Sequence, residues 1–521
     1  MGGERMENLK HFPQNMNKAI LDYSLNLNMD ELVKVVTSMH NDESAGGYIS
    51  LLLSGMLSKE NADMQALVGD CYYQGKVVHK SVSKAVNCFK EAYQNGSIIG
   101  SYDLGWYYYD QNEFLSAIEY FEKCLDEKNS FDDNQISNIY SCLGDSYLDI
   151  SEPKYSKALE YLAVAADKYH SGYANRRLGI FYGEKTCKYF DAEKCIKYYE
   201  QAAYLGDVDA AVSLGDVYIS GDEELNVQKN LLKAEKILLP FSESDNPELL
   251  FFLGRLYTMN ESDFHGDMTL AIKYFNKSYQ IDKNWLVAAW LGYAYYTEDM
   301  YAQAEEMLLI ADEHGCRLFS DFLGRIYKGG LVGNRDFHRA RKYYGHAYEN
   351  EGLNNMITCA EFTEVLMEVG EYLTAYEVAT YGKEQYNDIF FIFCQAKLII
   401  TGKISSETNM EKAADMLEAV ISYSTSEKTE AHLLLADYYL RTGSYRKAES
   451  HYLELFQEGF ADAGVYLGRL YEKGGGTIRA NINLAYEWYE KAKNQGSELG
   501  EKEISCFQRS FFGGLKRIRS L

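Results

Sequence analysis

Most of the chain repeats one arrangement of apolar and small residues at intervals close to 36 positions. Its first half reads Leu-Gly-x-x-Tyr, and the flanking apolar residues recur at helical spacing. A period that recurs this often indicates a repeat array. Nine copies carry the glycine, at Gly69, Gly105, Gly144, Gly179, Gly215, Gly254, Gly292, Gly324 and Gly468.

The second half of each copy carries a small residue followed by aromatic residues, as in Ala340, Tyr343 and Tyr344. Offsets of three, four and seven place these side chains on one helical face, so each unit is predicted to be a hairpin of two helices, A and B. A glycine in the middle of a helix costs about 1 kcal/mol relative to alanine. Its retention predicts a close approach of helix A to helix B, with the helix B alanine facing the glycine and the tyrosine covering the contact.

These patterns resemble the Sel-one-like repeat (SLR) family, a relative of the tetratricopeptide repeat (TPR). The likeness rests on Leu-Gly-x-x-Tyr in helix A and Lys-Ala-x-x-x-Tyr-Tyr-x-x-Ala in helix B, with good copies at residues 194–206 and 484–496. It implies an all-α fold, a right-handed α/α superhelical solenoid of about twelve SLR/TPR-like hairpins. The spacing from the helix A glycine to the helix B small residue is 16 in some copies and 12 in others, so the A–B loops should differ in length.

Three regions follow from this pattern. Residues 1–62 lack it and are expected to be a disordered start and an N-terminal helical cap, with helices near 16–27, 30–40 and 45–58, or else a separate binding domain. Residues 63–498 form the repeat array. Residues 499–521 are expected to be a capping helix, reaching about 509, and a basic tail that is either frayed or a short linear motif.

Two repeats, at about residues 353–425, are degenerate because Ala360 and Ala396 take the places of the glycine. This stretch instead carries an apolar run from Phe390 to Phe393. Ordinary drift of a repeat explains it, and a change of curvature or a docking patch is the functional alternative.

The composition indicates which partners and which compartment to expect. Asp and Glu outnumber Lys and Arg by 77 to 52, which disfavours nucleic acid as a partner because phosphate binding relies on basic side chains. The most apolar run, residues 389–400, is too short to span a bilayer, and no apolar signal segment begins the chain, so no membrane insertion is expected. The ten cysteines contain no Cys-x-x-Cys pair and are interpreted as thiols in a reducing, cytoplasmic compartment.

No motif of catalysis accompanies the repeats. The chain has no phosphate-binding Gly-x-x-x-x-Gly-Lys-Ser/Thr loop and no His-Glu-x-x-His. Its glycine-rich stretches, residues 329–333 and 474–476, are interpreted as turns between helices. We therefore expect no enzyme activity, no cofactor and no metal.

The residues just after the repeat glycine and just after the repeat tyrosine are predicted to line the concave surface, as on a TPR-like helix A. The residues at these positions are often acidic near the start of the array and include basic residues in its middle. Aromatic residues and arginine dominate protein interfaces, so a group of them is predicted to bind a protein or peptide, with the arginines favouring an acidic one. The predicted contacts are Trp106, Tyr109, Arg255, Tyr293, Tyr296, Arg325 and Lys328.

The resemblance implies a non-enzymatic scaffold or adaptor that holds a partner on the concave face of the solenoid. Three alternatives remain open at this point. The chain could be a regulatory or sensor subunit whose curvature responds to a partner or ligand, with the degenerate repeats as its hinge. It could also be a structural protein that self-assembles through the ends of the array, or an enzyme with an unfamiliar site.

Overall fold

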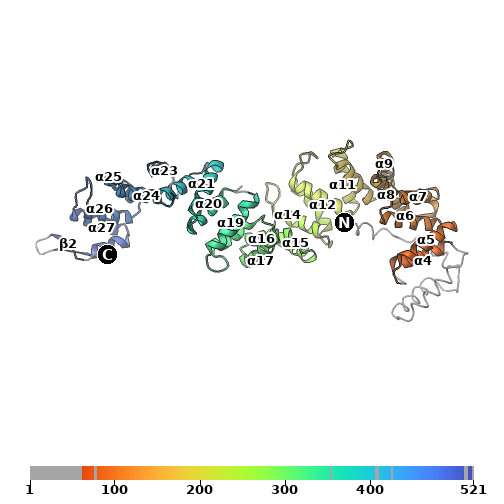
Figure 1. Ribbon diagram of the computed structural model, residues 1–521, viewed down its shortest axis with the longest axis horizontal. Helices are drawn as coiled ribbons and strands as arrows, with labels where there is room; N and C mark the ends of the chain where they lie inside the picture. Colours follow the sequence, from red (N-terminus) through yellow and green to blue (C-terminus); the bar gives the residue numbers. More distant parts are fainter. Residues whose placement is uncertain are drawn as a thin grey trace, which may run out of the picture. The chain divides into compact units, whose positions relative to one another are not determined.

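The computed structural model describes residues 62–75, 79–351, 355–404, 410–423, 426–509 and 514–518. The disordered start and the three helices expected before residue 62 lie outside this part of the chain. The chain divides into two compact units between Asp282 and Lys283, and each consists of consecutive helix pairs (Figure 1).

The first unit contains six described helix pairs. They are α4 (Ala62–Gln74) with α5 (Val82–Gln94), α6 (Ile98–Asp110) with α7 (Phe114–Asp126), α8 (Asp133–Asp149) with α9 (Tyr155–Ala163), α10 (Gly172–Gly183) with α11 (Ala192–Tyr204), α12 (Val208–Ser220) with α13 (Leu231–Leu238), and α14 (Pro247–Tyr257) with α15 (Met268–Ile281). The short helical turns η1 (Lys128–Ser130), η2 (Val164–Lys168) and η3 (Leu239–Phe241) follow three of the B helices.

The second unit adds six more described pairs and a different C-terminal end. The pairs are α16 (Trp285–Thr297) with α17 (Tyr301–Glu313), α18 (Ser320–Gly329) with α19 (Phe337–Glu351), α20 (Met356–Glu368) with α21 (Tyr372–Tyr386), α22 (Ile389–Ile400) with α23 (Met410–Ser422), α24 (Lys428–Arg441) with α25 (Tyr445–Gln457), and α26 (Asp462–Lys473) with α27 (Ile482–Asn494). The final helix is α28 (Glu498–Ser505). Twelve hairpins in the described residues confirm the expected all-α solenoid.

The repeat glycine does bring helix A close to helix B, but the residue that faces it differs from the expectation. A Cβ on Gly324 would lie 2.8 Å from the ring of Tyr344, which is four residues after the buried Ala340. The glycine therefore makes room for a bulky side chain rather than for the alanine. The facing residues in the nine copies are Phe89, Phe121, Leu162, Tyr199, Leu238, Phe275, Leu308, Tyr344 and Tyr489.

The repeat tyrosine packs between two helices, and the hairpin of α18 and α19 shows how. The Tyr327 ring stacks on Tyr343 with an interplanar angle of 18°. Arg339, just before the helix B alanine, lies over the Tyr327 ring at 5.2 Å, and the Tyr327 hydroxyl donates a hydrogen bond to Glu305 of the preceding hairpin. The basic residue and the paired tyrosines of the helix B motif therefore hold the repeat tyrosine in place. The same stacking joins Tyr108 to Tyr120, Tyr147 to Tyr161, Tyr182 to Tyr198, and Tyr257 to Tyr274.

The turn from helix B to the next helix A combines a glycine with a capping residue. Gly96 and Gly206 have φ values of 88° and 94°, a region that glycine enters without steric cost. The next residues, Ser97 and Asp207, accept hydrogen bonds from backbone amides in the first turn of the following helix. This pairing ends one hairpin and begins the next within a few residues.

The degenerate repeats are part of one continuous apolar core in the second unit. That core extends from Ala304 to Leu467 and includes the helices of the degenerate stretch. Phe391 is fully buried, and its ring fills the space beside Gly382, where a Cβ would lie only 2.4 Å away. The loss of the repeat glycine therefore does not interrupt the core at this place in the chain.

The C-terminal segment differs from the expected helix and frayed tail. Helix α28 ends at Ser505, and β1 (Phe507–Arg509) then pairs antiparallel with β2 (Leu515–Arg517). The Arg517 guanidinium pairs with Glu472 and with Glu503, whose side chain is 1% exposed. The basic residue of the tail therefore neutralises the buried Glu503 of α28 and the partly exposed Glu472 of the last repeat, which a pattern based on helical spacing could not predict.

None of the helices in the described ranges combines the length and apolar character needed to cross a membrane.

Candidate partner-binding site

At two places, the residues that follow the repeat glycine or its equivalent link one helix A to the next helix A along the chain. Arg255 Nη1 lies 3.1 Å from Asp216, and Arg325 Nε lies 2.8 Å from Glu361. The partners are 39 and 36 residues apart, close to the repeat period. We term this series of bonds the inter-repeat ladder. Its members were expected to face a partner, yet each already binds a neighbouring repeat.

Two of the predicted contact residues lie in the interior of the first unit. Trp106 is 2% exposed and packs edge-on against Phe121, with ring centroids 6.0 Å apart. Tyr109 is 5% exposed, and its hydroxyl donates to Asp145 at 2.8 Å. The expectation that both side chains face an open surface is wrong, because Trp106 packs within its own hairpin and Tyr109 bonds to Asp145 of the next helix A.

A buried polar cluster surrounds Asp145. The carboxylate, 2% exposed, accepts hydrogen bonds from Tyr109, from Tyr173 and from the Arg177 guanidinium. Burial, followed by the charge of Asp145, raises the pKa of Tyr173 well above its ordinary value. The cluster satisfies one buried charge completely and therefore acts within the fold rather than at a surface.

Arg255 belongs to the first unit and is separate from the predicted residues of the second unit. Its guanidinium lies between Asp216 and the ring of Phe252, 5.4 Å from the ring centroid. Tyr293, in the second unit, packs on Phe319 and Phe322 with centroid distances of 4.9 and 5.4 Å. Both residues thus have structural partners of their own.

Three of the predicted contacts, Tyr296, Arg325 and Lys328, share a groove in the second unit. The groove has a volume of about 660 Å³ and extends along α16, α18, α20, α22 and the start of α24. It is lined by Tyr296, Arg325, Lys328, Gly329, Leu331, Arg335, Phe337, Glu361, Glu364, Met367, Glu368, Phe390, Phe393, Cys394, Lys397, Ser426, Glu427 and Glu430.

Part of the groove comes from the degenerate repeats, where a docking patch was the functional alternative to ordinary drift of the repeat. Phe390 of α22 and Met367 of α20 are partly exposed and supply the apolar surface, whereas Phe393 is 4% exposed and belongs mainly to the core. The repeat period was a usable signal, since Arg325, Glu361 and Lys397 are each 36 residues apart and all line the groove. Residues at one register of successive A helices therefore share one face.

The groove carries charges of both signs. Its lining includes four basic and five acidic side chains. Lys328 lies 2.6 Å from Glu364, and Lys397 lies 2.7 Å from Glu430, so most of the basic groups are already paired. Arg335 and Glu368 are exposed and form no ion pair with the other described residues. The groove is therefore amphipathic and close to neutral, not basic as predicted for the middle of the array.

Burial changes the electrostatics beside the groove. Arg325 also approaches Asp321 at 3.3 Å, and burial raises the pKa of the Asp321 carboxyl despite the opposing effect of the Arg325 charge. Within the described residues, the groove holds no group of three imidazole, thiol and carboxylate side chains close enough to share a metal ion. Its arrangement suits non-covalent binding of a segment with apolar and charged side chains.

The chain is similar to repeat proteins in sequence. The Sel1 repeat profile matches residues 62–97, 143–170, 172–207, 322–351 and 461–497, and a tetratricopeptide repeat profile matches residues 408–463. A sel1-like repeat-containing protein of Acanthamoeba polyphaga mimivirus is 27% identical over 127 residues, which are 24% of this chain and 22% of that protein. The matched segment thus spans less than a quarter of the relative's length.

The chain is also similar to a solved structure. The crystal structure of a protective antigen present in uropathogenic Escherichia coli strains, which displays an SLR fold, superposes with a TM-score of 0.57. The two chains are 18% identical, and the superposition covers 87% of this chain and 89% of the other. At this level of identity the likeness concerns the fold alone.

Proposed function

Because the chain belongs to the Sel1-like and tetratricopeptide-like repeat family, we propose that it is a non-enzymatic scaffold or adaptor that binds a protein segment in the groove of its second unit. Repeat arrays of this kind generally mediate protein–protein interactions, and their stacked helices offer extended binding surfaces. The fold is typically non-catalytic. The groove is the surface of this chain that best fits such a role.

The single observation that carries the proposal is the groove itself. The partly exposed apolar side chains of Met367 and Phe390 lie beside exposed charged groups on successive A helices. Binding sites on proteins combine an apolar centre with a polar rim in this way. A segment in extended or helical form would place its apolar side chains against Met367 and Phe390 and its charges against the rim.

The charges of the groove define the chemistry of the partner. Arg325 already pairs with Glu361 and Asp321, which reduces its capacity to attract an acidic segment. The exposed and unpaired groups, Arg335 and Glu368, have opposite signs. We therefore propose a partner with an apolar anchor flanked by both acidic and basic residues, in place of the purely acidic partner first predicted.

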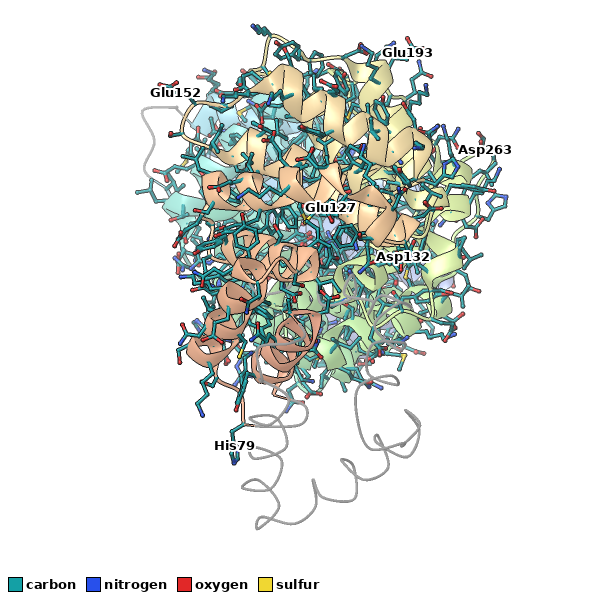
Figure 2. All side chains as sticks on the ribbon, turned by 90° about the vertical axis from the view of Figure 1, so that its right-hand side faces the viewer. His79, Glu127, Asp132, Glu152, Glu193 and Asp263 are labelled. Atoms are coloured by element: carbon teal, nitrogen blue, oxygen red, sulfur yellow. The ribbon has the colours of Figure 1, made fainter. Side chains whose placement is uncertain are left out.

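A protein partner is favoured over nucleic acid by the acidic surface. In the first unit, Glu152, Glu193 and Asp263 are exposed at the periphery, as Figure 2 shows, and they would repel a phosphate backbone. A cytoplasmic location is part of the same proposal. It is supported by buried thiols such as Cys124 and Cys142, whose pKa values burial raises, as expected of unreactive core residues.

The test compares partner capture by matched variants of the intact chain. Proteins from the native cell extract are captured on the wild type and identified by mass spectrometry. Arg335→Glu with Glu368→Lys reverses two exposed charges of the groove that form no ion pair with the other described residues, and it preserves the net charge. Lys383→Glu with Glu384→Lys does the same on exposed positions of α21, outside the groove lining.

We expect one stoichiometric protein partner that the groove variant loses and the α21 variant retains, because rim charges determine which segments can dock. Equal capture by all three proteins would refute the assignment of the groove. Capture of no protein by the wild type would refute the adaptor function itself.

A further inference from the structure

Two buried histidines join the helices of the eleventh hairpin. His432 on α24 and His451 on α25 are 0% and 6% exposed, and their Nδ1 atoms lie 3.0 Å apart. Glu454 follows one turn after His451 and is exposed. One ligand atom from each of these three residues lies within 4.8 Å of the others. In the described part of the chain, no other group of this kind is found.

The hydrogen bonding of the pair is incomplete. His432 Nε2 is buried and has no hydrogen-bond partner among the described residues. Such atoms are rare in folded proteins, so the histidine pair is not a closed hydrogen-bonded arrangement. The other ring nitrogen, Nδ1, faces Nδ1 of His451 at 3.0 Å. Two imidazole nitrogens that face each other need a proton or a cation between them, because each otherwise presents a lone pair. The pair therefore does more than fill the core.

The separation of the two rings suits a shared metal ion. Zinc binds imidazole nitrogen at about 2.0–2.1 Å, and two such ligands at the tetrahedral angle are about 3.3 Å apart. The observed 3.0 Å needs an opening of only a few tenths of an ångström. Two imidazoles and one carboxylate are a ligand set that zinc and similar ions accept, with water in the fourth position.

The His451 ring is fixed by its surroundings. Its Nε2 lies 3.4 Å from Glu418 on α23, which leaves Nδ1 for the ion. A carboxylate in this place fixes the tautomer and orientation of a ligating histidine. The ring also stacks on Tyr439 at an interplanar angle of 5°, where other repeats use a tyrosine for the same contact. His451 therefore keeps the stacking contact that a tyrosine makes in other repeats, but it brings an imidazole that can bind a metal ion.

We propose that His432, His451 and Glu454 bind one divalent transition-metal ion, of which zinc is the representative, and that the ion joins α24 to α25. The exposed Glu454 gives the ion a path from solvent to the buried imidazoles. Mg²⁺ and Ca²⁺ prefer sites built from oxygen ligands and are excluded by this set. Glu418 is a positioning residue because it acts through His451.

The experiment uses the full chain after treatment with a chelator and desalting. Zn²⁺ binding is measured by calorimetry, and Co²⁺ is used as a spectroscopic probe because imidazole ligands in a tetrahedral site produce intense visible absorption. We expect one Zn²⁺ per chain, no competition from excess Mg²⁺ or Ca²⁺, and a rise in Tm when Zn²⁺ is added.

Variants identify the ligands. Glu454→Gln changes an exposed side chain and should weaken Zn²⁺ binding by more than the 10–100-fold that loss of a positioning carboxylate costs. Glu418→Gln should fall in that 10–100-fold range. His451→Gln should abolish both binding and the cobalt spectrum, and Glu490→Gln, an exposed glutamate on α27, is the matched control.

The outcomes are decisive even if His451→Gln fails to fold, because Glu454→Gln alters only a surface carboxylate. Absence of Zn²⁺ binding by the wild type would overturn the proposal. Binding that is equal in Glu454→Gln and Glu490→Gln would also overturn it, since the ion would then be held by the general acidity of the surface.

Discussion

The close approach of helix A to helix B can be tested within a single hairpin, because α18 and α19 contain two glycines in opposite situations. A Cβ on Gly324 would lie 2.8 Å from three atoms of the Tyr344 ring, whereas a Cβ on Gly345 would meet nothing within 4 Å. Both glycines lie inside helices and neither has a positive φ. Replacement of each by alanine therefore separates helix propensity from packing.

The two substitutions should have different effects on stability. Gly345→Ala should stabilise the protein by about 1 kcal/mol, the propensity difference between the two residues. Gly324→Ala gains the same propensity, but ordinary contact begins near 3.4 Å, so the fully buried Tyr344 ring must move by about 0.6 Å. Overpacking of this kind costs roughly 1–3 kcal/mol. The difference between the two variants should therefore be about 1–3 kcal/mol.

The assay is urea-induced unfolding followed by circular dichroism, with the same transition compared in all variants because repeat arrays can unfold in steps. A control variant, Tyr344→Ala, removes the ring against which the new Cβ would clash. In Tyr344→Ala, the substitution Gly324→Ala should become about as favourable as Gly345→Ala, since the ring is gone. Equal stabilisation by both alanines in the wild-type background would refute the argument that the repeat glycine makes room for the facing side chain.

Three further effects follow from the structure. Arg177→Ala should destabilise the first unit by about 3–5 kcal/mol, measured by thermal unfolding, because Asp145 would keep a buried charge without its cationic partner. Burial raises the pKa of Tyr161 and of Tyr471 to about 12. The stability linked to this shift is complete below pH 10 and should be lost as the pH rises towards 12, which absorbance of tyrosinate during alkaline titration would detect. Phe391→Ala should cost about 3–5 kcal/mol in unfolding experiments, because the ring lies in the core and is not a docking residue.

The hairpins could be predicted from the sequence because their signals are local. The glycine and tyrosine of helix A recur at a fixed offset, the alanine and aromatic residues of helix B do the same, and each contact within a hairpin joins residues close in sequence. The alanine of helix B, Ala340, was expected to face Gly324, but the residue that does so, Tyr344, lies one helical turn later. Tyr344 and Ala340 lie on the same face of α19, and the spacing alone does not decide which of them meets Gly324.

The surface could not be predicted in the same way. Whether Tyr109 faces a partner depends on the next hairpin, which supplies its hydrogen-bond acceptor Asp145, and a pattern within one repeat contains no information about that contact. Three of the predicted contact residues, Tyr296, Arg325 and Lys328, do line the groove, and the period places Arg325 on one face with later residues. The imidazoles of His432 and His451 meet across two helices at a spacing that no short motif describes.

The inter-repeat ladder explains why charge at a repeat position is a poor guide to a partner. An arginine after the repeat glycine is 36 residues from its equivalent in the next repeat, and the solenoid brings those two positions together, as Arg325 and Glu361 show. A charge at this register therefore meets a charge of the same chain before it meets a partner. Reversing Arg325 alone would break this internal pair and confuse a folding defect with a binding defect. Recognition in the groove must then depend on groups outside the ladder, and for that reason the variants of Arg335 and Glu368 are the sharper test of binding.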